Sequence, residues 1–196
     1  MSRLPTRERL LNATLELLAE RGGDLRVEDV ATAAGVTRQT VYLNFGSRTG
    51  LLVAAVEHLD ADGTLASLTR EIIHAPNGVA ALDAAVHLEA AYDPVIYPVA
   101  KVLIAARRTD EAALAAWQNR MEVRRNGARH VVERLAREGS LDPSWEIEAA
   151  TDLAFALVSF EVWEHLVIER GWSASQYEEH LRRVLHAALL RDAPGT

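Results

Sequence analysis

Apolar residues recur every three or four positions along most of the chain, which is the spacing of one face of an α-helix. An early stripe consists of Leu10, Leu11, Thr14, Leu17 and Leu18. A later stripe consists of Leu51, Leu52, Ala55, Val56 and Leu59. No stretch alternates apolar and polar residues for long enough to indicate a strand. The pattern predicts an all-α protein of eight to ten helices.

Turn-forming and capping residues separate the predicted helices. The glycine pair at 22–23 is expected to end the first helix, and Gly35 permits a sharp turn further on. Ser47 is expected to cap the helix that follows it. The segment Ser173–Gln176 has the spacing of a capping box.

Two Asp-Pro dipeptides resemble helix starts as well, because a carboxylate can cap a helix and proline suits its first position. Helices are therefore expected to begin at Asp93-Pro94 and at Asp142-Pro143. Pro98 falls inside the first of these helices, where it should kink the backbone and release a carbonyl group. An irregular helix of this kind favours a cavity beside it.

Two short helices are expected between Gly23 and Ser47, joined by the turn at Gly35. Thr37 is expected to cap the second one. A rotation of about 100° per residue places Val41 and Phe45 together on its inward side. The outward side then carries Gln39, Thr40, Tyr42 and Leu43.

This outward side has the chemistry of a surface that contacts a DNA duplex. Glutamine can form two hydrogen bonds with a base edge, threonine can meet a base or a phosphate, and leucine can contact a thymine methyl group. Phosphate contacts are expected from Arg38, Tyr42 and Arg48. Helix, glycine turn, helix is the helix-turn-helix arrangement. The plainer alternative is a pair of short helices with a solvated outer face.

The formal net charge of −7 is unevenly distributed. Residues 1–50 carry seven arginines and six acidic residues, a balance of +1, whereas the remainder carries fourteen basic and twenty-two acidic residues, a balance of −8. A nearly neutral N-terminal segment on an acidic body is compatible with two separate tasks.

Several classes of protein and site are not expected. The chain has no cysteine, and its seven histidines include no pair spaced for metal binding on a helix, so neither disulfides nor a metal site is predicted. Glycine-rich phosphate loops and nucleophile motifs are missing from the sequence, so neither an enzyme nor a cofactor is expected. No apolar run has the length of a membrane span, and the N-terminal segment lacks the apolar core of a signal peptide. A cytoplasmic protein without membrane association is predicted.

The segment VEDVATAAGVTRQTVYLNFGSRTGLL, Val27–Leu52, resembles the N-terminal signature of the TetR family of bacterial transcriptional regulators. The resemblance rests on the alanine-glycine-valine turn, on the Tyr42-x-x-Phe45 end of the second short helix, and on Arg48 after a serine. It implies a three-helix DNA-binding domain over residues 1–48, followed by a helical ligand-binding and dimerisation domain over residues 49–196. The DNA-binding positions that it implies are Arg26, Thr37, Arg38, Gln39, Thr40, Tyr42, Leu43, Asn44 and Arg48.

Three residues depart from the family pattern. Arg26 stands where a capping Thr or Ser is common, so Asp24 is the expected cap instead. Asn44 replaces a frequent His or Tyr. Gly50 stands where an acidic residue often completes a capping box with the serine, which should weaken the start of that helix by ~0.5–1 kcal/mol.

The aromatic residues of the C-terminal part are candidates for the wall of an effector pocket, although core packing is the alternative for each of them. Trp117 and Met121 belong to a helical stripe from Leu114 to Leu135 that contains a single charged residue, Arg124. A buried guanidinium needs an anion, and Asp152 or an acidic ligand group is the expected partner; alternatively, the side chain reaches water. The predicted ligand-binding residues are Tyr92, Tyr97, Trp117, Met121, Arg124, Asp152 and Phe155.

Dimerisation is expected through the last two helices, over about 142–168 and 173–190. The segment from Leu153 to Phe160 is apolar nearly all round, so we expect it to be covered on two sides, one of them by a partner chain. Together these features predict a homodimeric repressor that a mostly apolar effector releases from a near-palindromic double-stranded DNA operator. The alternative is a helical small-molecule binding module that no longer reads DNA.

Overall fold

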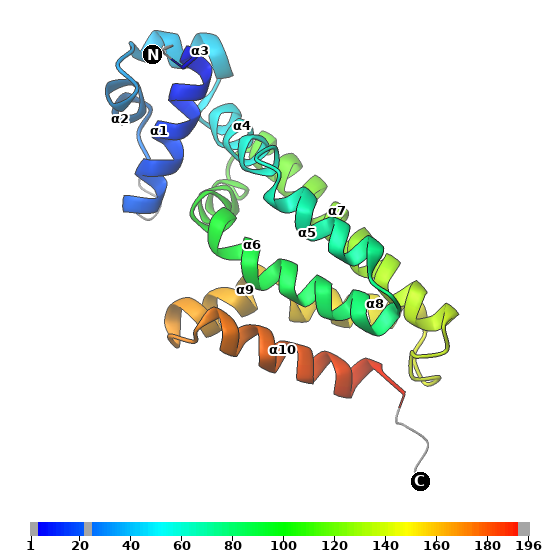
Figure 1. Ribbon diagram of the computed structural model, residues 1–196. Coiled ribbons are helices and arrows are strands. Elements are labelled where there is room, and N and C mark those ends of the chain that lie inside the picture. Colours follow the sequence, from blue (N-terminus) through cyan, green and yellow to red (C-terminus); the bar gives the residue numbers. More distant parts are fainter. Residues whose placement is uncertain (1–3, 22–24, 192–196) are drawn as a thin grey trace. The chain divides into compact units, whose positions relative to one another are not determined.

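The computed structural model describes residues 4–21 and 25–191, and within these ranges its regular elements are helices joined by short loops, without a strand (Figure 1). An isolated bridge joins Leu141 to Leu190. The elements are α1 (Thr6–Arg21), α2 (Val27–Ala33), α3 (Arg38–Phe45), α4 (Arg48–Asp60), α5 (Thr64–His74), α6 (Gly78–Ala106), α7 (Glu111–Arg137), α8 (Ile147–Leu157), α9 (Phe160–Trp163), the π-helix η1 (Glu164–Glu169) and α10 (Ala174–Leu189). The predicted all-α fold is confirmed.

The chain divides into two compact units. The first holds the described residues up to Asp62 together with Val95–Asn119, and the second holds Gly63–Pro94 together with the described residues from Arg120 onward. The long helices α6 and α7 therefore each contribute residues to both units. The predicted domain boundary between residues 48 and 49 stays a prediction. Within the described ranges, none of the helices combines the length and the hydropathy required of a membrane span.

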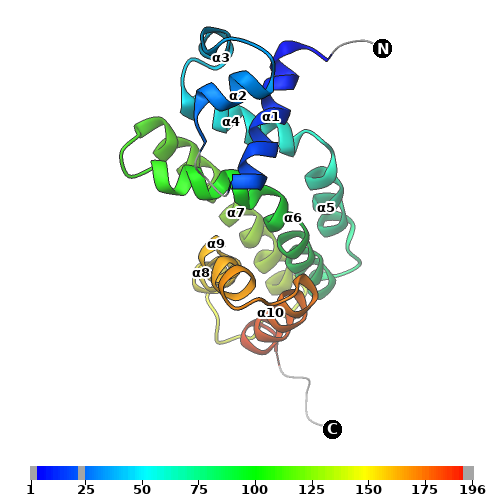
Figure 2. The same cartoon turned by 90° about the vertical axis from the view of Figure 1, so that its left-hand side faces the viewer.

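The N-terminal helices pack on one another within the first unit. Helix α1 contacts α2 and α4, and α3 contacts both α2 and α4 (Figure 2). The side chains of this core are almost fully buried and include Leu10, Leu11, Leu18, Val30, Val41, Leu51 and Leu52. The short helices α2 and α3 each bury few side chains of their own, so α1 and α4 supply most of the surface that holds them.

The second unit has its own core, which α6, α7, α8 and α10 supply. Its buried residues include Leu82, Val86, Ala90, Val131, Val132, Leu135, Ala150, Ala154, Tyr177, Leu181, Leu185 and Leu189. Helix α10 contacts α8 and η1. At one end of this unit the indole N–H of Trp145 donates to the carbonyl oxygen of Ala188 over 2.6 Å.

Three of the predicted helix caps are confirmed. The side chain of Thr37 accepts from the backbone N–H of Thr40, and that of Ser47 accepts from the backbone N–H of Gly50. Ser173 and Gln176 form the predicted capping box of α10. The turn at Gly35 has a φ of 66°, which glycine adopts without strain. Helix α1 ends at Arg21; the glycine pair at 22–23 and the suggested cap Asp24 lie outside the described residues.

The predicted helix start at Asp93-Pro94 is wrong. Helix α6 runs unbroken from Gly78 to Ala106, through both Pro94 and Pro98. Each proline lacks the N–H that would bond the carbonyl oxygen four residues earlier. Buried side chains on either side of the prolines, including Val86 and Val99, offset this loss by packing. Asp93 is consequently an interior helix residue and not a cap.

The C-terminal helices also begin and end elsewhere than predicted. Asp142 accepts from the backbone N–H and the hydroxyl of Ser144, which forms a turn, and α8 begins only at Ile147. The apolar segment 153–160 is not one helix, because α8 ends at Leu157 and α9 begins only at Phe160. Ser159 caps the short helix α9 there by accepting from the backbone N–H of Val162.

Gly50 is required by a close backbone approach that the sequence does not reveal. A Cβ atom at this position would lie 2.1 Å from the carbonyl oxygen of Phe45, so a side chain can be accommodated only if α3 and α4 move apart. The glycine that looks like the loss of a capping acid is therefore the residue that lets these helices join by a short turn.

We expect Gly50→Ala to lower the free energy of unfolding of the first unit by ~1–3 kcal/mol, because the new methyl group overlaps the Phe45 carbonyl. Denaturant unfolding followed by circular dichroism measures this change. The matched control is Gly127→Ala, since Gly127 lies inside α7 with open space around its Cβ position. That control should stabilise the protein by ~0.5–1 kcal/mol. A neutral or stabilising Gly50→Ala would contradict the close approach.

Candidate functional site

Helix α3 presents a surface formed by Gln39, Tyr42 and Leu43, which we call the α3 surface. Val41 on the opposite side is 1% exposed, whereas Leu43 is 79% exposed. Gln39 is exposed too, and Tyr42 is 36% exposed. The structure thus places the outward residues of α3 as the helical periodicity predicted. A leucine exposed to this degree on a short polar helix is suited to contact with another molecule.

Arg38 is held in place at the start of α3 by two neighbours. Its guanidinium forms an ion pair with Glu28 at 2.7 Å, donates to the hydroxyl of Tyr42 over 3.2 Å, and lies 5.3 Å from the centre of the Tyr42 ring. The hydrogen bond with Tyr42 and the charge of Glu28 raise the pKa of Arg38. An anion that approaches Arg38 therefore competes with Glu28 for the guanidinium.

Thr37, Thr40 and Asn44 form hydrogen bonds within α3. The hydroxyl groups of Thr37 and Thr40 lie 2.9 Å apart, and the amide of Asn44 donates to the carbonyl oxygen of Thr40 over 2.7 Å. These bonds fix the two ends of the helix. Gln39 and Leu43 take no part in these bonds, and both side chains are exposed.

Arg48 and Arg26 have different surroundings. The Nε–H of Arg48 donates to the carbonyl oxygen of Leu25 over 3.0 Å, which ties the start of α4 to the segment before α2. Arg26 is exposed at the N-cap position of α2 and forms no side-chain capping bond. Arg48 therefore has a structural role in addition to any contact with phosphate.

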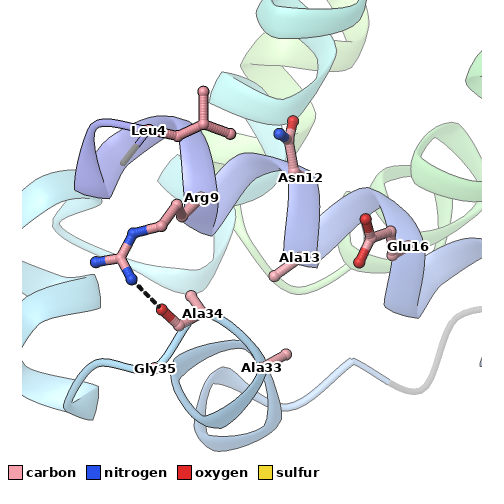
Figure 3. A pocket seen from close by; sticks show the side chains of 8 residues that line it. All are labelled: Leu4, Arg9, Asn12, Ala13, Glu16, Ala33, Ala34 and Gly35. Atoms are coloured by element: carbon pink, nitrogen blue, oxygen red, sulfur yellow. Dashed lines mark hydrogen bonds between the residues drawn. The ribbon is translucent and has the colours of Figure 1, made fainter. Parts of the chain in front are cut away.

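Sequence reasoning missed Arg9, which holds the α2–α3 turn from α1. Its guanidinium donates to the carbonyl oxygen of Ala34 over 2.9 Å (Figure 3). It lies in a shallow groove lined by Leu4, Arg9, Asn12, Ala13, Glu16, Ala33, Ala34 and Gly35. The available signal was an arginine directly beside the buried stripe of α1. That position allowed it to reach the turn that precedes α3.

The predicted effector residues are divided between the two units. Tyr97 and Trp117 belong to the first unit, where both are buried and where Lys101 and Arg107 lie over their respective rings at 5.4 and 5.1 Å. The second unit contains Tyr92, Met121, Arg124, Asp152 and Phe155. In that unit, Tyr92 is buried and Met121 and Phe155 are half-buried.

Arg124 is the centre of a buried cluster of charges in the second unit. It donates to Glu89 over 2.5 Å, to Asp93 over 3.1 Å and to the carbonyl oxygen of Val158 over 3.0 Å. The Arg124 side chain is 11% exposed, that of Glu89 is 14% exposed, and that of Asp93 is fully buried. The guanidinium also lies 4.3 Å from the centre of the Phe160 ring. We call Glu89, Asp93, Arg124 and their neighbour Tyr177 the Arg124 cluster.

Two sequence-based explanations of Arg124 are therefore wrong. Its guanidinium does not extend into water, and its partner is not Asp152. Asp152 is instead an exposed residue of α8 that pairs with Arg125 at 2.7 Å. Arg125 also pairs with Glu148 at 2.9 Å. The neighbouring arginine points to the surface because successive side chains on a helix are rotated by about 100°.

Arg124 also explains the break between α8 and α9. In an uninterrupted helix the carbonyl oxygen of Val158 would accept from the backbone N–H of Val162. Arg124 donates to that carbonyl instead, and the Ser159 hydroxyl accepts from the Val162 N–H. Both helix groups are thus satisfied by side chains, so the helix can end where its apolar sequence would have continued it.

Burial shapes the electrostatics of the Arg124 cluster. Burial raises the pKa of Glu89, against the opposing effect of Arg124. Burial and then the charge of Glu89 raise the pKa of Asp93 to about 7. Burial disfavours the charge of Arg124, but Glu89 and Asp93 outweigh it and leave the guanidinium pKa raised. Burial, followed by the two carboxylates, also raises the pKa of Tyr177.

Comparison with known families identifies the N-terminal helices. Residues 10–55 match the family described as bacterial regulatory proteins, tetR family. A 51-residue stretch is 47% identical to the HTH-type transcriptional regulator AlkX of Mycobacterium tuberculosis and covers 26% of this chain and 24% of that protein. The N-terminal segment of the chain is therefore similar to the DNA-binding segment of TetR-family regulators. The aligned stretch spans about a quarter of the length of this curated relative.

Solved structures share the fold of most of the chain. One is described as a transcriptional regulator from Saccharomonospora viridis in complex with choline, with a TM-score of 0.80, 16% identity, and coverage of 94% of this chain and 97% of that one. Another is the regulator FadR from Bacillus subtilis in complex with stearoyl-CoA, with a TM-score of 0.75, 14% identity, and coverage of 92% and 97%. At these identities the likeness concerns the fold. The family that matches residues 10–55 is one of bacterial regulatory proteins.

The TetR resemblance did not single out the two acidic partners of Arg124. A usable signal was present, because Glu89 and Asp93 are four residues apart and thus share one face of a mostly apolar helix. The dipeptide Asp93-Pro94 concealed it by resembling a helix start. Within the described ranges, no group of three or more potential metal ligands gathers in one place.

We expect the free energy of unfolding of the protein to fall as the pH rises through neutrality. The folded state holds a proton on Asp93 up to a pH of about 7, whereas the unfolded chain loses it near the ordinary carboxyl pKa of 3.8. The stabilisation is complete below about pH 4 and is lost as the pH rises through about 7. Between about pH 6 and about pH 8 the loss due to Asp93 should be about 1 kcal/mol.

Urea unfolding at a series of pH values measures this slope, and Asp93→Asn should remove most of it. Asp152→Asn is the matched control, since the Asp152 side chain is 65% exposed and its substitution should leave the slope unchanged. An identical slope in the wild type and in Asp93→Asn would contradict the assignment.

Proposed function

We propose that this protein is a homodimeric, DNA-binding transcriptional repressor that a small-molecule effector releases from a near-palindromic operator. The observation that carries the proposal is the α3 surface, where an exposed glutamine, tyrosine and leucine stand on a helix whose ends are fixed by internal hydrogen bonds. Such a helix can enter the major groove without first becoming ordered. The protein would act in the cytoplasm, where bacterial DNA lies.

Each side chain of the α3 surface has a separate role in this proposal. Gln39 is suited to a two-bond contact with a base edge, preferably adenine, and Leu43 to a thymine methyl group. Tyr42 and Arg38 would contact phosphates, with Arg38 exchanging Glu28 for the phosphate oxygen. Thr37, Thr40, Asn44, Arg26 and Arg48 complete the proposed contact set. Because the chain as a whole carries a charge of −7, this local set must supply the attraction for DNA.

The proposed effector site lies in the second unit around Tyr92, Met121, Arg124 and Phe155. The complexes of fold relatives with choline and with stearoyl-CoA support a small-molecule effector. Asp152 is left out of this site because its carboxylate is exposed and paired with Arg125. An effector that binds one conformation more tightly than the other would shift the population away from the form that binds DNA.

The proposed dimer forms through α8 and α10. The sequence pattern of the last helix also makes Leu185 and Leu189 candidates for a partner contact, but they lie inside the subunit at 1% and 0% exposure and are not available for it. Val184 on the outer side of α10 is 49% exposed, and Ile168 of η1 is 52% exposed. These side chains are the apolar surface available for a second copy.

We expect Gln39→Ala to relax the sequence preference of DNA binding at one base pair per half-site, by ~1–3 kcal/mol. The binding site is first selected from a random duplex library, and wild type and variant are then compared by fluorescence anisotropy on single-base substitutions. Glu57→Gln, an exposed residue of α4, is the control and should keep the wild-type preference. If Gln39→Ala kept the wild-type sequence preference, Gln39 would not be a base-recognising residue. Failure of the wild type to select any sequence would favour the alternative, a helical module that binds small molecules only.

We expect Val184→Glu to weaken the dimer at least tenfold, or about 1.4 kcal/mol, because it places a charge in an apolar contact. Sedimentation velocity across micromolar concentrations measures the change. Val123→Glu is the matched control, because Val123 is a similarly exposed valine, at 63%, on α7. A monomeric wild type, or a Val184→Glu variant that dimerises normally, would contradict the proposed interface.

A further inference from the structure

The buried part of the Arg124 cluster contains two carboxylates and one guanidinium. Glu89 and Asp93 share the single guanidinium of Arg124. Arg120, one turn earlier on α7, adds a weaker positive influence on both carboxylates. An excess buried carboxylate is costly unless a positive charge or a proton accompanies it.

Two buried polar atoms of this cluster have no hydrogen-bond partner among the described residues. They are Oδ2 of Asp93 on α6 and the hydroxyl oxygen of Tyr177 on α10. The carboxylates of Asp93 and Glu89 both act on the pKa of Tyr177, so the phenol lies within the field of the same cluster. Buried polar atoms without partners are rare in proteins, and two in one charged cluster indicate a site that accepts a polar group.

The charge of the cluster selects the chemistry of that group. An acidic ligand end would bring a third negative charge close to two carboxylates, and Arg124 is already paired with both of them. A cationic nitrogen would instead complete the charge balance and, if it carries N–H groups, donate to Oδ2 of Asp93. The Phe160 ring, which already lies 4.3 Å from one cation, suits a positive group.

We propose that the Arg124 cluster binds the positively charged nitrogen of an amine or quaternary ammonium effector, with Asp93 as its counter-ion. This inference specifies the chemical class of the effector. It rests on the proposed function only in taking the bound ligand to be a regulatory effector. It replaces the acidic ligand end that the sequence indicated. The apolar part of the molecule would lie against Tyr92 and Phe160.

The segment next to the cluster is suited to admit such a ligand. Arg124 holds the Val158 carbonyl at the break between α8 and α9, and the π-helix η1 follows directly after α9. Neither the break nor the π-helix has regular α-helical bonding, and π-helical turns occur often at functional sites. A cation that neutralises Asp93 would weaken the hold of Arg124 on α6 and thereby couple ligand binding to this segment.

Three probes with the same alkyl chain test the proposal on the full-length wild type, namely octyltrimethylammonium, octan-1-ol and octanoate, below their micellar concentrations. Calorimetric titration at about pH 8 should show the ammonium compound binding at least tenfold more tightly than the alcohol, and octanoate more weakly than the alcohol. Lowering the pH to about 6 should weaken ammonium binding about tenfold, because a proton then occupies Asp93. The groups that face Asp93 are Glu89, Arg120, Arg124 and Tyr177, and of these Glu89 would strengthen the same trend.

Asp93→Asn should reduce ammonium affinity at least tenfold and leave octan-1-ol affinity within twofold. Asp152→Asn, which removes an exposed carboxylate of α8, should change neither. Octanoate binding as tight as ammonium binding, no preference of ammonium over the alcohol, or unchanged ammonium affinity in Asp93→Asn would each overturn the proposal. If Asp93→Asn does not fold, the proposal is tested by the order of the wild-type affinities for the three probes and by the pH dependence of ammonium binding.

These titrations need no DNA, so they are separate from the test of the proposed repressor. If the protein selects no DNA sequence but prefers the ammonium probe, the proposed repressor function is contradicted and the proposed cation site is supported. If the protein binds a selected operator but shows no preference for the ammonium probe, the proposed repressor function is supported and the proposed cation site is contradicted.

Discussion

The second unit depends on the balance between one buried guanidinium and two buried carboxylates. Arg124 can be removed from water only because Glu89 and Asp93 accompany it, and the carboxylates are buried only because Arg124 is present. The three side chains join α6 to α7, and the bond to Val158 adds the end of α8. An apolar cluster of the same volume would hold these helices together without directional contacts that favour one register. The charged cluster favours one register, because its hydrogen bonds are directional.

Arginine has a comparable role in the first unit, where it bonds to backbone instead of carboxylate. Arg9 of α1 donates to Ala34 before the α2–α3 turn, and Arg48 of α4 donates to Leu25 before α2. Both bonds position helices that are too short to hold themselves by buried area. The orientation of α3 thus depends on contacts outside α3. Its polar surface is exposed as a consequence of how its neighbours are bonded.

The two units use charge in opposite ways. On α3, Arg38 is paired with Glu28 at the surface, where water screens the interaction and exchange for another anion is inexpensive. In the Arg124 cluster, burial makes every change of charge costly, so the site discriminates strongly by the sign of an incoming group. The first arrangement suits reversible contact with a polyanion. The second suits recognition of one small charged molecule.

The sequence by itself determined the helical class, the similarity of the N-terminal segment to TetR-family regulators, and the local ends of several helices. Thr37, Ser47 and the Ser173–Gln176 box could be predicted because a cap involves residues only three positions apart. The turn at Gly35 and the outward face of α3 were predictable for the same reason. Glycine chemistry and the 3.6-residue period are properties of the local chain.

Only the tertiary structure decided what Asp93, Gly50 and Val158 do. Asp93 has the sequence context of a cap, but packing carries α6 through its prolines and buries the carboxylate against α7. Gly50 looks like a missing acid until the Phe45 carbonyl occupies the space of its side chain. Val158 lies in an apolar run that would continue as helix, yet a guanidinium 34 positions earlier in the chain takes its carbonyl oxygen. In each case the deciding atom belongs to another helix, and its distance is set by how whole helices pack, which local sequence does not encode.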